Sequence, residues 1–438
     1  MASTKTGEVH AVAHASWRWW QLVLGVIAMV AAANIQYGWT LFVPEIEKTY
    51  KWSRSDIQWT FTIFVLVQTW LTPFEGYLID RVGPRIIVLV GGLCTGLAWV
   101  LYSQANTLES FYIGAVVAGI GVGCVYATCI NNAIKWFPDK RGLAVGLTAG
   151  AYGAGSALTI LPIDAMIKAG QFKDAFFNYG VAQGVIIMIA ALFLFSPRRG
   201  ETPVSKTIVQ ARHQYTLGEA LKTPLFYLLF AMFILTVTGG LMAVAQLGPM
   251  AKDLGVKDAP INVWSPLYGW IIISALPFAL ILDRIMNGLS RPIFGAISDR
   301  IGRENTMFIA FAMEGIGIIA LAKLGTSPWM FVLLSGIVFL AWGEVYSLYS
   351  ATSADAFGTE NIGSIYGVLY CAKGVAALLI PFSSMIVAAY GWSVLLYGVA
   401  AMDILAAFAA LLLLKPALRA HHKRYPATGP VAEMAHAH

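Results

Sequence analysis

The segment Gly76-Tyr77-Leu78-Ile79-Asp80-Arg81-Val82-Gly83 occurs a second time, half the chain later, as Gly295-Ala296-Ile297-Ser298-Asp299-Arg300-Ile301-Gly302. Both copies keep a glycine, an aspartate, an arginine and a final glycine in the same order and spacing. Repetition at half the chain length is typical of a protein made of two similar halves.

A second repetition supports this division. Gly142 and Gly146 recur as Gly363 and Gly367, and each pair opens the apolar run that follows a short polar loop. Glycines spaced four apart lie on one helix face and allow close helix packing. The spacing does not separate a sliding surface from ordinary tight packing.

The composition places the chain in a lipid bilayer. Of its 438 residues, 58% are hydrophobic and only 12% are charged, and the mean hydropathy is +0.69. These are too few charges for the surface of a soluble protein of this size. Runs long enough to cross a bilayer, about 20 residues each, begin near Trp19, Ile57, Arg85, Leu108, Arg141, Phe172, Leu225, Ser265, Thr306, Trp329, Asn361 and Trp392.

We therefore predict an all-α membrane protein with twelve transmembrane helices in two six-helix halves. The predicted parts are an N-terminal tail (1–16), a first half (17–197), a linker (198–224), a second half (225–415) and a C-terminal tail (416–438). Most of the 29 Lys and Arg residues fall in loops on one side if both termini are cytoplasmic, as the positive-inside rule requires. The first apolar run is too long for the core of a cleaved signal peptide.

The charge and the cysteines exclude several other classes of function. The formal charge of +6 is spread over separate short loops, which favours contact with anionic lipid over nucleic acid. Cys94, Cys124, Cys129 and Cys371 lie within apolar runs without metal-ligand spacing. No dinucleotide, P-loop, haem or zinc fingerprint is present, so we expect no cofactor, no metal and no enzymatic activity.

Three basic residues, Arg284, Arg291 and Lys373, remain inside apolar runs after every other Lys and Arg has been assigned to a loop or a tail. A charge at the centre of a bilayer costs at least ~2.5–3.5 kcal/mol, so such residues usually bind a counter-ion or a substrate. At 1.5 Å per residue, Arg291 lies about 12 Å and Lys373 about 18 Å along its helix from a membrane boundary. The two can share one depth and bind an anion.

Acidic residues offer a competing explanation for the cations. Asp283 adjoins Arg284, and we interpret the two as a structural pair or a proton site rather than as substrate ligands. Glu344 could pair with Arg291 or Lys373, although it points away from Trp342 and Tyr346 on its helix. Pairing of Lys373 with Glu344 or Asp403, only to hold helices together, stays an open alternative.

Polar and aromatic residues in the same runs could line a site for a small anion. Hydrogen-bonding groups on several helices are needed to orient a carboxylate. The candidates are Gln36, Tyr37, Gln58, Tyr126, Asn287, Trp342, Tyr346 and Tyr370.

The repeated motif resembles the loop signature of the major facilitator superfamily, whose members rock two six-helix halves about a central site. The resemblance covers Gly76, Asp80, Arg81 and Gly83, and again Gly295, Asp299, Arg300 and Gly302. In this interpretation the aspartates accept hydrogen bonds at helix ends, while Arg81 and Arg300 pair across the seam that closes the cytoplasmic side.

Longer segments resemble the bacterial oxalate/formate antiporter family. They are Ile35–Thr40, Trp136–Ala144, Asn287–Pro292 and Ala372-Lys373. The resemblance implies that Arg291 and Lys373 bind the two carboxylates of the substrate, and most of the candidate lining matches as well. Tyr370 stands where an oxalate carrier has Trp, and Asp283, Arg284 and Glu344 replace uncharged residues there. Proton-linked monocarboxylate carriers, which share the arginine of span eight, are the nearest alternative.

The two cations also predict a mechanism. A bound dianion would cancel both charges, whereas an empty carrier would have to close around them, so exchange is favoured over uniport. All seven histidines (His10, His14, His213, His421, His422, His436 and His438) lie in loops or tails. Proton symport would therefore need Asp283, Glu344 or another buried acid. Exchange of a dianion for a monoanion would move charge and respond to membrane potential.

We expect a monomer in the inner membrane of a bacterium, with small carboxylate anions and the lipid bilayer as its partners and with both termini in the cytoplasm. A transporter-like sensor is a more distant alternative. The tails are short and carry no recognisable signalling domain, and only a carrier would show flux stimulated by anion on the opposite side.

Overall fold

The computed structural model describes residues 3–137, 140–197, 201, 213–265, 269–358 and 361–424. The first half of the chain is helical throughout its described part. Its elements are α1 (Ser3–Ala32), α2 (Asn34–Tyr37), α3 (Trp39–Tyr50), α4 (Arg54–Trp70), α5 (Thr72–Val82), α6 (Pro84–Gln104), α7 (Leu108–Trp136), α8 (Arg141–Ala154), the 3-10 turn η1 (Gly155–Leu158), α9 (Ile160–Lys168) and α10 (Phe172–Leu192).

The second half follows the same plan with one addition, a β-hairpin. Its elements are α11 (Leu217–Ala220), α12 (Pro224–Asp253), β1 (Pro260–Ser265), β2 (Gly269–Ser274), α13 (Ala275–Ile301), α14 (Arg303–Leu324), α15 (Pro328–Trp342), α16 (Val345–Phe357), α17 (Ile362–Ala377), α18 (Leu379–Tyr390), α19 (Trp392–Ala409), the π turn η2 (Ala410–Leu414) and α20 (Lys415–Arg424).

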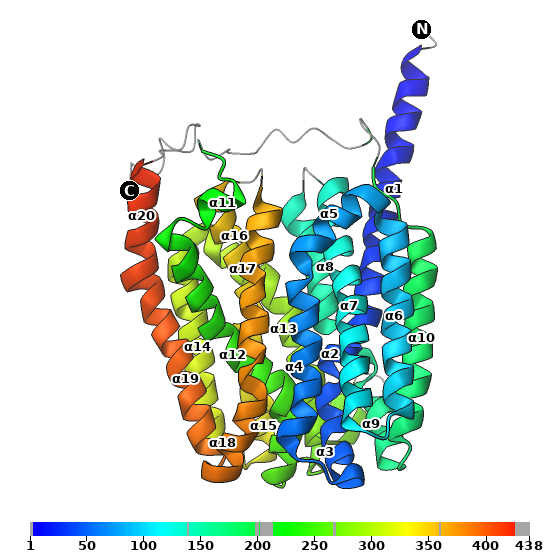
Figure 1. Cartoon of the computed structure of the whole chain (residues 1–438), viewed down its shortest axis with the longest axis vertical. Coiled ribbons are helices and arrows are strands. Elements are labelled where there is room, and N and C mark those ends of the chain that lie inside the picture. The colour runs from blue at the N-terminus through cyan, green and yellow to red at the C-terminus, as the bar shows by residue number, and fades with distance from the viewer. Residues whose placement is uncertain are drawn as a thin grey trace.

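The helices run side by side as one bundle, with the first half (blue to green) beside the second (green to red) (Figure 1). The chain enters through α1 and leaves through α20 at the same end of the bundle, which we name the inner end. The opposite, outer end carries α3, α9 and α18. An even number of crossings in each half explains why α1 and α20 reach the same end of the bundle.

Ten helical segments of the described chain are long and apolar enough to cross a membrane. The two other predicted spans are present but differ in composition. One is the pair α4–α5, which is interrupted at Leu71; the other is α13, which is 27 residues long but carries Asp283, Arg284 and Arg291. The protein is a multi-pass, helical membrane protein, as predicted.

The expected start of span eight near Ser265 is wrong. Residues 260–265 and 269–274 form a pair of antiparallel strands in which Pro260 pairs with Ser274 and Val263 with Ile271, and the helix begins only at Ala275. The run is rich in β-branched residues, which fit a strand better than a helix. An apolar run of this kind satisfies a hydropathy window in either conformation.

Several spans are interrupted near mid-membrane. Breaks separate α2 from its neighbours, α8 from α9, α15 from α16 at Gly343 and Glu344, and α17 from α18 at Leu378. Interrupted helices line the substrate sites of many carriers because they free backbone polar groups at that depth. Gln36, Tyr37, Trp342 and Tyr346 lie next to these breaks, whereas Lys373 lies inside α17, before the break at Leu378.

The end of the linker between the halves packs on the second half. Thr216 and Glu219 form a capping box at α11, and the backbone N–H of Tyr215 donates to Phe357 O at 3.0 Å. Hydrogen bonds from Thr216 lower the pKa of the Glu219 carboxyl below its ordinary value. The rest of the predicted linker, the C-terminal tail beyond 424 and the first two residues lie outside the described residues.

Candidate functional site: a central cationic cluster

Lys373, on α17, is the centre of a polar cluster between the halves. Its Nζ donates to Gln68 Oε1 at 3.1 Å and to Gln36 Oε1 and Tyr370 Oη at 3.3 Å each. Only 2% of Lys373 is exposed. Its described hydrogen-bond partners are therefore neutral acceptors from the first half, together with one tyrosine of its own helix.

Arg291, on α13, approaches the same centre from another direction. Its guanidinium carbon and Lys373 Nζ each lie 5.7 Å from the ring centroid of Tyr346. Tyr126 lies within hydrogen-bonding reach of Arg291, whose Nε has no partner. Neither cation forms an ion pair with an acid among the residues that the structure describes.

Aromatic rings enclose the two cations. Tyr126 stacks on Tyr370 at 6.2 Å, and Tyr346 meets Tyr370 edge-on at 5.8 Å and Trp342 at 5.5 Å. Tyr37 packs on Tyr152 at 5.4 Å. The rings exclude water while their π faces and hydroxyls interact with cations and anions respectively.

Several hydrogen-bond donors in this cage have no partner. They are Gln36 Nε2, Arg291 Nε, Trp342 Nε1, Asn287 Nδ2 and the hydroxyl of Tyr346. A buried unpaired donor costs ~1–3 kcal/mol. A bound anion, which is an acceptor on every side, would satisfy several of these donors at once.

Arg284 and Asp283, expected to act as a structural pair or a proton site, form no direct salt bridge in the described structure, although they lie within electrostatic range of each other. The two side chains diverge because adjacent residues face different directions on a helix. The guanidinium of Arg284 lies between the rings of Tyr37 at 4.5 Å and Phe339 at 4.3 Å, and none of its nitrogens has a hydrogen-bond partner. It is a third buried cation, one turn from Asn287.

Glu344 does not pair with Arg291 or Lys373 either. It is fully buried with both carboxyl oxygens unpartnered, and it lies within electrostatic range of Glu314. Asp403 lies near Glu314 as well. The alternative in which Glu344 or Asp403 neutralises Lys373 is therefore absent from this conformation, and these acids form a separate group within the second half.

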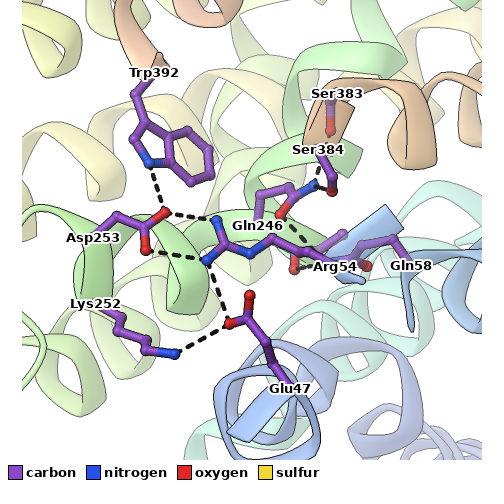
Figure 2. A network of polar contacts seen from close by, with 10 residues as sticks. Glu47, Arg54, Gln58, Gln246, Lys252, Asp253, Ser383, Ser384 and Trp392 are labelled. Atoms are coloured by element: carbon purple, nitrogen blue, oxygen red, sulfur yellow. Dashed lines mark hydrogen bonds and ion pairs between the residues drawn. The ribbon is translucent and has the colours of Figure 1, made fainter. Parts of the chain in front are cut away.

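Gln58 lies outside the central cluster, against expectation. Its Nε2 donates to Ala245 O at 2.8 Å, its Oε1 accepts from Trp39 Nε1 at 3.3 Å, and it adjoins Gln246 near the outer end (Figure 2). Two residues that were not predicted take part instead. Gln68 binds Lys373, and Tyr152 donates to Gln36 Oε1 at 2.9 Å and accepts from Gln68 Nε2 at 3.2 Å.

A signal for Tyr152 was present in the second repetition. At the spacing that relates Gly142 and Gly146 to Gly363 and Gly367, the residue in the first half that corresponds to Lys373 is Tyr152. The two occupy matching places in matching helices. No such signal marks Gln68.

Charged side chains join the halves at the outer end, and we name this group the outer clasp (Figure 2). Arg54 binds both carboxyl oxygens of Asp253, at 2.6 and 3.1 Å. Lys252 and Arg54 contact Glu47 at 3.1 and 3.4 Å, and Trp392 Nε1 donates to Asp253 at 3.0 Å. The clasp closes the outer end in this conformation.

Neutral hydrogen bonds extend the closure inward along α4, in what we call the outer seam. Ser55 donates to Pro381 O at 3.1 Å and Thr62 to Ala377 O at 2.8 Å, while Gln58 donates to Ala245 O. These acceptors lie on helices of the second half. The central cluster is therefore covered on its outer side by two kinds of contact.

The repeated motif lies at the inner end, where it ends α5 and α13. Gly83 and Gly302 stop these helices with φ of 85° and 90°, a conformation that favours glycine. Asp299 accepts from Arg303 at 2.8 Å, and Arg303 also contacts Asp355 of α16 at 3.2 Å, whereas Arg300 is exposed. The side chain of Asp80 lies outside the described residues.

The fold and the motif define a membrane carrier made of two halves. The chain belongs to the major facilitator superfamily, and the model of that family matches residues 24–291 and 285–435. The family resemblance predicted from the sequence is thereby confirmed. Members of this family are transporters, not enzymes. Among the described residues, no group of three or more His, Cys, Asp or Glu side chains could hold a metal ion.

The chain is similar to individual carriers over most of its length. It is 32% identical to the oxalate:formate antiporter of Oxalobacter formigenes over 86% of both chains. Monocarboxylate transporter 2 of Meriones unguiculatus is 24% identical over 78% of this chain and 72% of its own length. The fujikurins efflux protein of Gibberella fujikuroi is 25% identical, over 85% and 77% respectively.

Proposed function

We propose that this protein carries small carboxylate anions across the membrane by alternating access, and that it exchanges one anion for another. The observation that carries the proposal is the central cluster itself. Arg291 and Lys373 are buried without an acidic partner in the described structure, and unpaired donors surround them. An anion with two carboxylates supplies the missing charges and acceptors together.

The chemistry assigns a role to each cation. The planar guanidinium of Arg291 suits two parallel hydrogen bonds to one carboxylate, whereas the ammonium of Lys373 acts as a point charge for the second. Gln36 and Asn287 add amide donors, and Tyr346 lies between the two cations. The similarity to an oxalate:formate antiporter supports oxalate and formate as the first anions to test.

The closed outer end supports alternating access. In the described residues, the ion pairs that join the halves belong to the outer clasp or to Lys168, which contacts Asp258 at 3.3 Å. A carrier needs such closures to break and form again in every cycle. We further propose the inner membrane of a bacterium as its location, with the inner end in the cytoplasm, and a monomer as the working unit.

Exchange is tested with the purified protein in proteoliposomes loaded with formate at equal pH on both sides. External labelled oxalate should enter much faster than into vesicles without internal anion. The variant Arg291→Lys should lose this flux because it loses the bidentate geometry. The matched control is Arg419→Lys, which alters an exposed arginine on α20.

Two outcomes contradict the proposal. Uptake that is indifferent to internal formate would exclude exchange. Wild-type flux in the Arg291→Lys variant would show that the central cluster does not bind the transported anion, whatever that anion is.

A further inference from the structure

Three carboxyl groups meet inside the second half, away from the central cations. Glu314 comes from α14, Asp403 from α19 and Glu344 from the break between α15 and α16, and each is fully buried. None of their six carboxyl oxygens has a hydrogen-bond partner in the described structure. We name Glu314, Asp403 and Glu344 the acid cluster.

The geometry shows that two of the three carboxyls, those of Glu314 and Asp403, converge. A Cβ atom placed on Gly239 of α12 would lie 2.9 Å from Asp403 Oδ2 and 2.9 Å from Glu314 Oε1, so both carboxyls face the same backbone position. Glu314 also lies within electrostatic range of Glu344. Gly239 keeps this space open because it has no side chain.

A tyrosine hydroxyl adds an independent sign that the cluster holds a ligand. Tyr349 of α16 is fully buried, lies within electrostatic range of all three acids, and its hydroxyl has no partner. Its ring is fixed by stacking on Phe233 at 4.4 Å. The titratable groups facing the cluster are thus Tyr349 and the three carboxyls themselves, without a described cation among them.

Such a group cannot be fully ionised. An isolated buried carboxylate costs several kcal/mol, and like charges that share a site repel each other. Protons bound to the carboxyl oxygens remove both penalties, and the Tyr349 hydroxyl can donate to an oxygen that remains ionised. The ligand that fits the cluster is therefore the proton.

The acid cluster is connected to the central cluster through one interrupted helix. Glu344 lies in the break between Trp342 and Tyr346, both of which line the cationic cluster. Gly240, next to Gly239, packs against the ring of Trp342. Movement of this break on anion binding would displace Glu344 relative to Glu314 and Asp403.

We propose that Glu314, Asp403 and Glu344 form a proton-binding site that is loaded from one side of the membrane and emptied on the other as the α15–α16 break moves. A proton from outer water forms an O–H bond with a carboxyl oxygen, and that bond breaks when the proton is released to inner water. Net uptake of a monoanion then carries a proton with it and is electrically neutral. The proposal rests on the proposed function only for the choice of formate as probe.

The first test measures protons without requiring transport. Infrared difference spectra of the purified full-length protein, with and without formate, should contain a deuterium-sensitive carbonyl band of a protonated carboxylic acid. Glu314→Gln or Asp403→Asn should remove or shift it. Glu75→Gln is the matched control, since Glu75 is also buried with unpartnered oxygens but lies in α5 of the first half. A spectrum without this band in the wild-type protein overturns the proposal even if the variants fail to fold.

The second test uses vesicles without internal anion. An inward gradient of one pH unit, worth about 1.36 kcal/mol for each proton carried, should raise the initial rate of labelled formate uptake well above that of protein-free vesicles, which formic acid enters by passive diffusion. Glu314→Gln should abolish the response and keep oxalate–formate exchange at equal pH, whereas Glu75→Gln should keep both. A pH response retained in Glu314→Gln and Asp403→Asn, or uptake driven by a sodium gradient instead, would refute a proton site. Loss of exchange in the wild type would instead count against the proposed function.

Discussion

The variant Lys373→Gln separates the two carboxylates of a bound dianion. In the structure Lys373 Nζ touches only neutral groups, the carbonyl oxygens of Gln36 and Gln68 and the hydroxyl of Tyr370. A glutamine amide donates to the same acceptors, so the packing is kept and the charge is removed. The loss is then one charge-assisted hydrogen bond to the ligand, ~1.5–3 kcal/mol.

This free energy corresponds to a dissociation constant that is about ten- to hundredfold larger, because 1.36 kcal/mol corresponds to about tenfold. Only a dianion should lose this binding free energy, because the single carboxylate of a monoanion is bound by Arg291. The assay is protection against thermal unfolding by oxalate, formate, lactate and acetate over a range of concentrations. Lys415→Gln is the control, since Lys415 also donates to a neutral amide, that of Asn305 at 2.9 Å. Equal losses for all four anions would refute the argument and make Lys373 a structural lysine.

Three further predictions concern the closed state and the stability of the fold. Asp253→Asn weakens the outer clasp by about 1 kcal/mol, so a cysteine introduced at Ser55 should react about fivefold faster with an impermeant thiol reagent; an unchanged rate would show that the clasp does not hold the outer end closed. Arg284→Met should raise the melting temperature without anion, because it removes a buried guanidinium whose nitrogens have no hydrogen-bond partner, and a lower melting temperature would show that the charge of Asp283 or the rings of Tyr37 and Phe339 stabilise Arg284. Gly302→Ala should lower stability by ~1 kcal/mol or more because of its φ of 90°, whereas Gly295→Ala, with open space around it inside α13, should not lower stability because alanine is the better helix former, and thermal unfolding of both variants measures the difference.

The approximate depth of a charged residue in the membrane was predictable from the sequence where that residue could not be assigned to a loop or a tail. Arg291 and Lys373 could not be assigned to any loop, and the structure brings them to the same tyrosine ring. Glu344 was expected to face away from Trp342 and Tyr346, and in the structure it lies near Glu314 rather than near the central cations. These inferences needed only helical periodicity and the energetic penalty for a buried charge.

Contacts between helices were not predictable in the same way. Gln58 and Gln68 lie on one helix, about 15 Å apart along its axis at 1.5 Å per residue, and sequence alone does not show which of them is level with Lys373. Asp283 and Arg284 form no direct salt bridge because neighbours in sequence face different directions on a helix, although they lie within electrostatic range of each other. The hairpin before α13 was missed because hydropathy does not distinguish a β-branched strand from a membrane helix.

The outer seam has a consequence for how water enters the protein. Its bonds join hydroxyl and amide groups of Ser55, Gln58 and Thr62 to backbone carbonyls of the other half. When the halves separate, each donor and each carbonyl can exchange its partner for a water molecule, so that only ~0.5–1.5 kcal/mol per bond is at stake. The donors and acceptors of the closed seam can therefore be hydrated as soon as the halves separate, so that water can reach the central cations along polar groups of both halves.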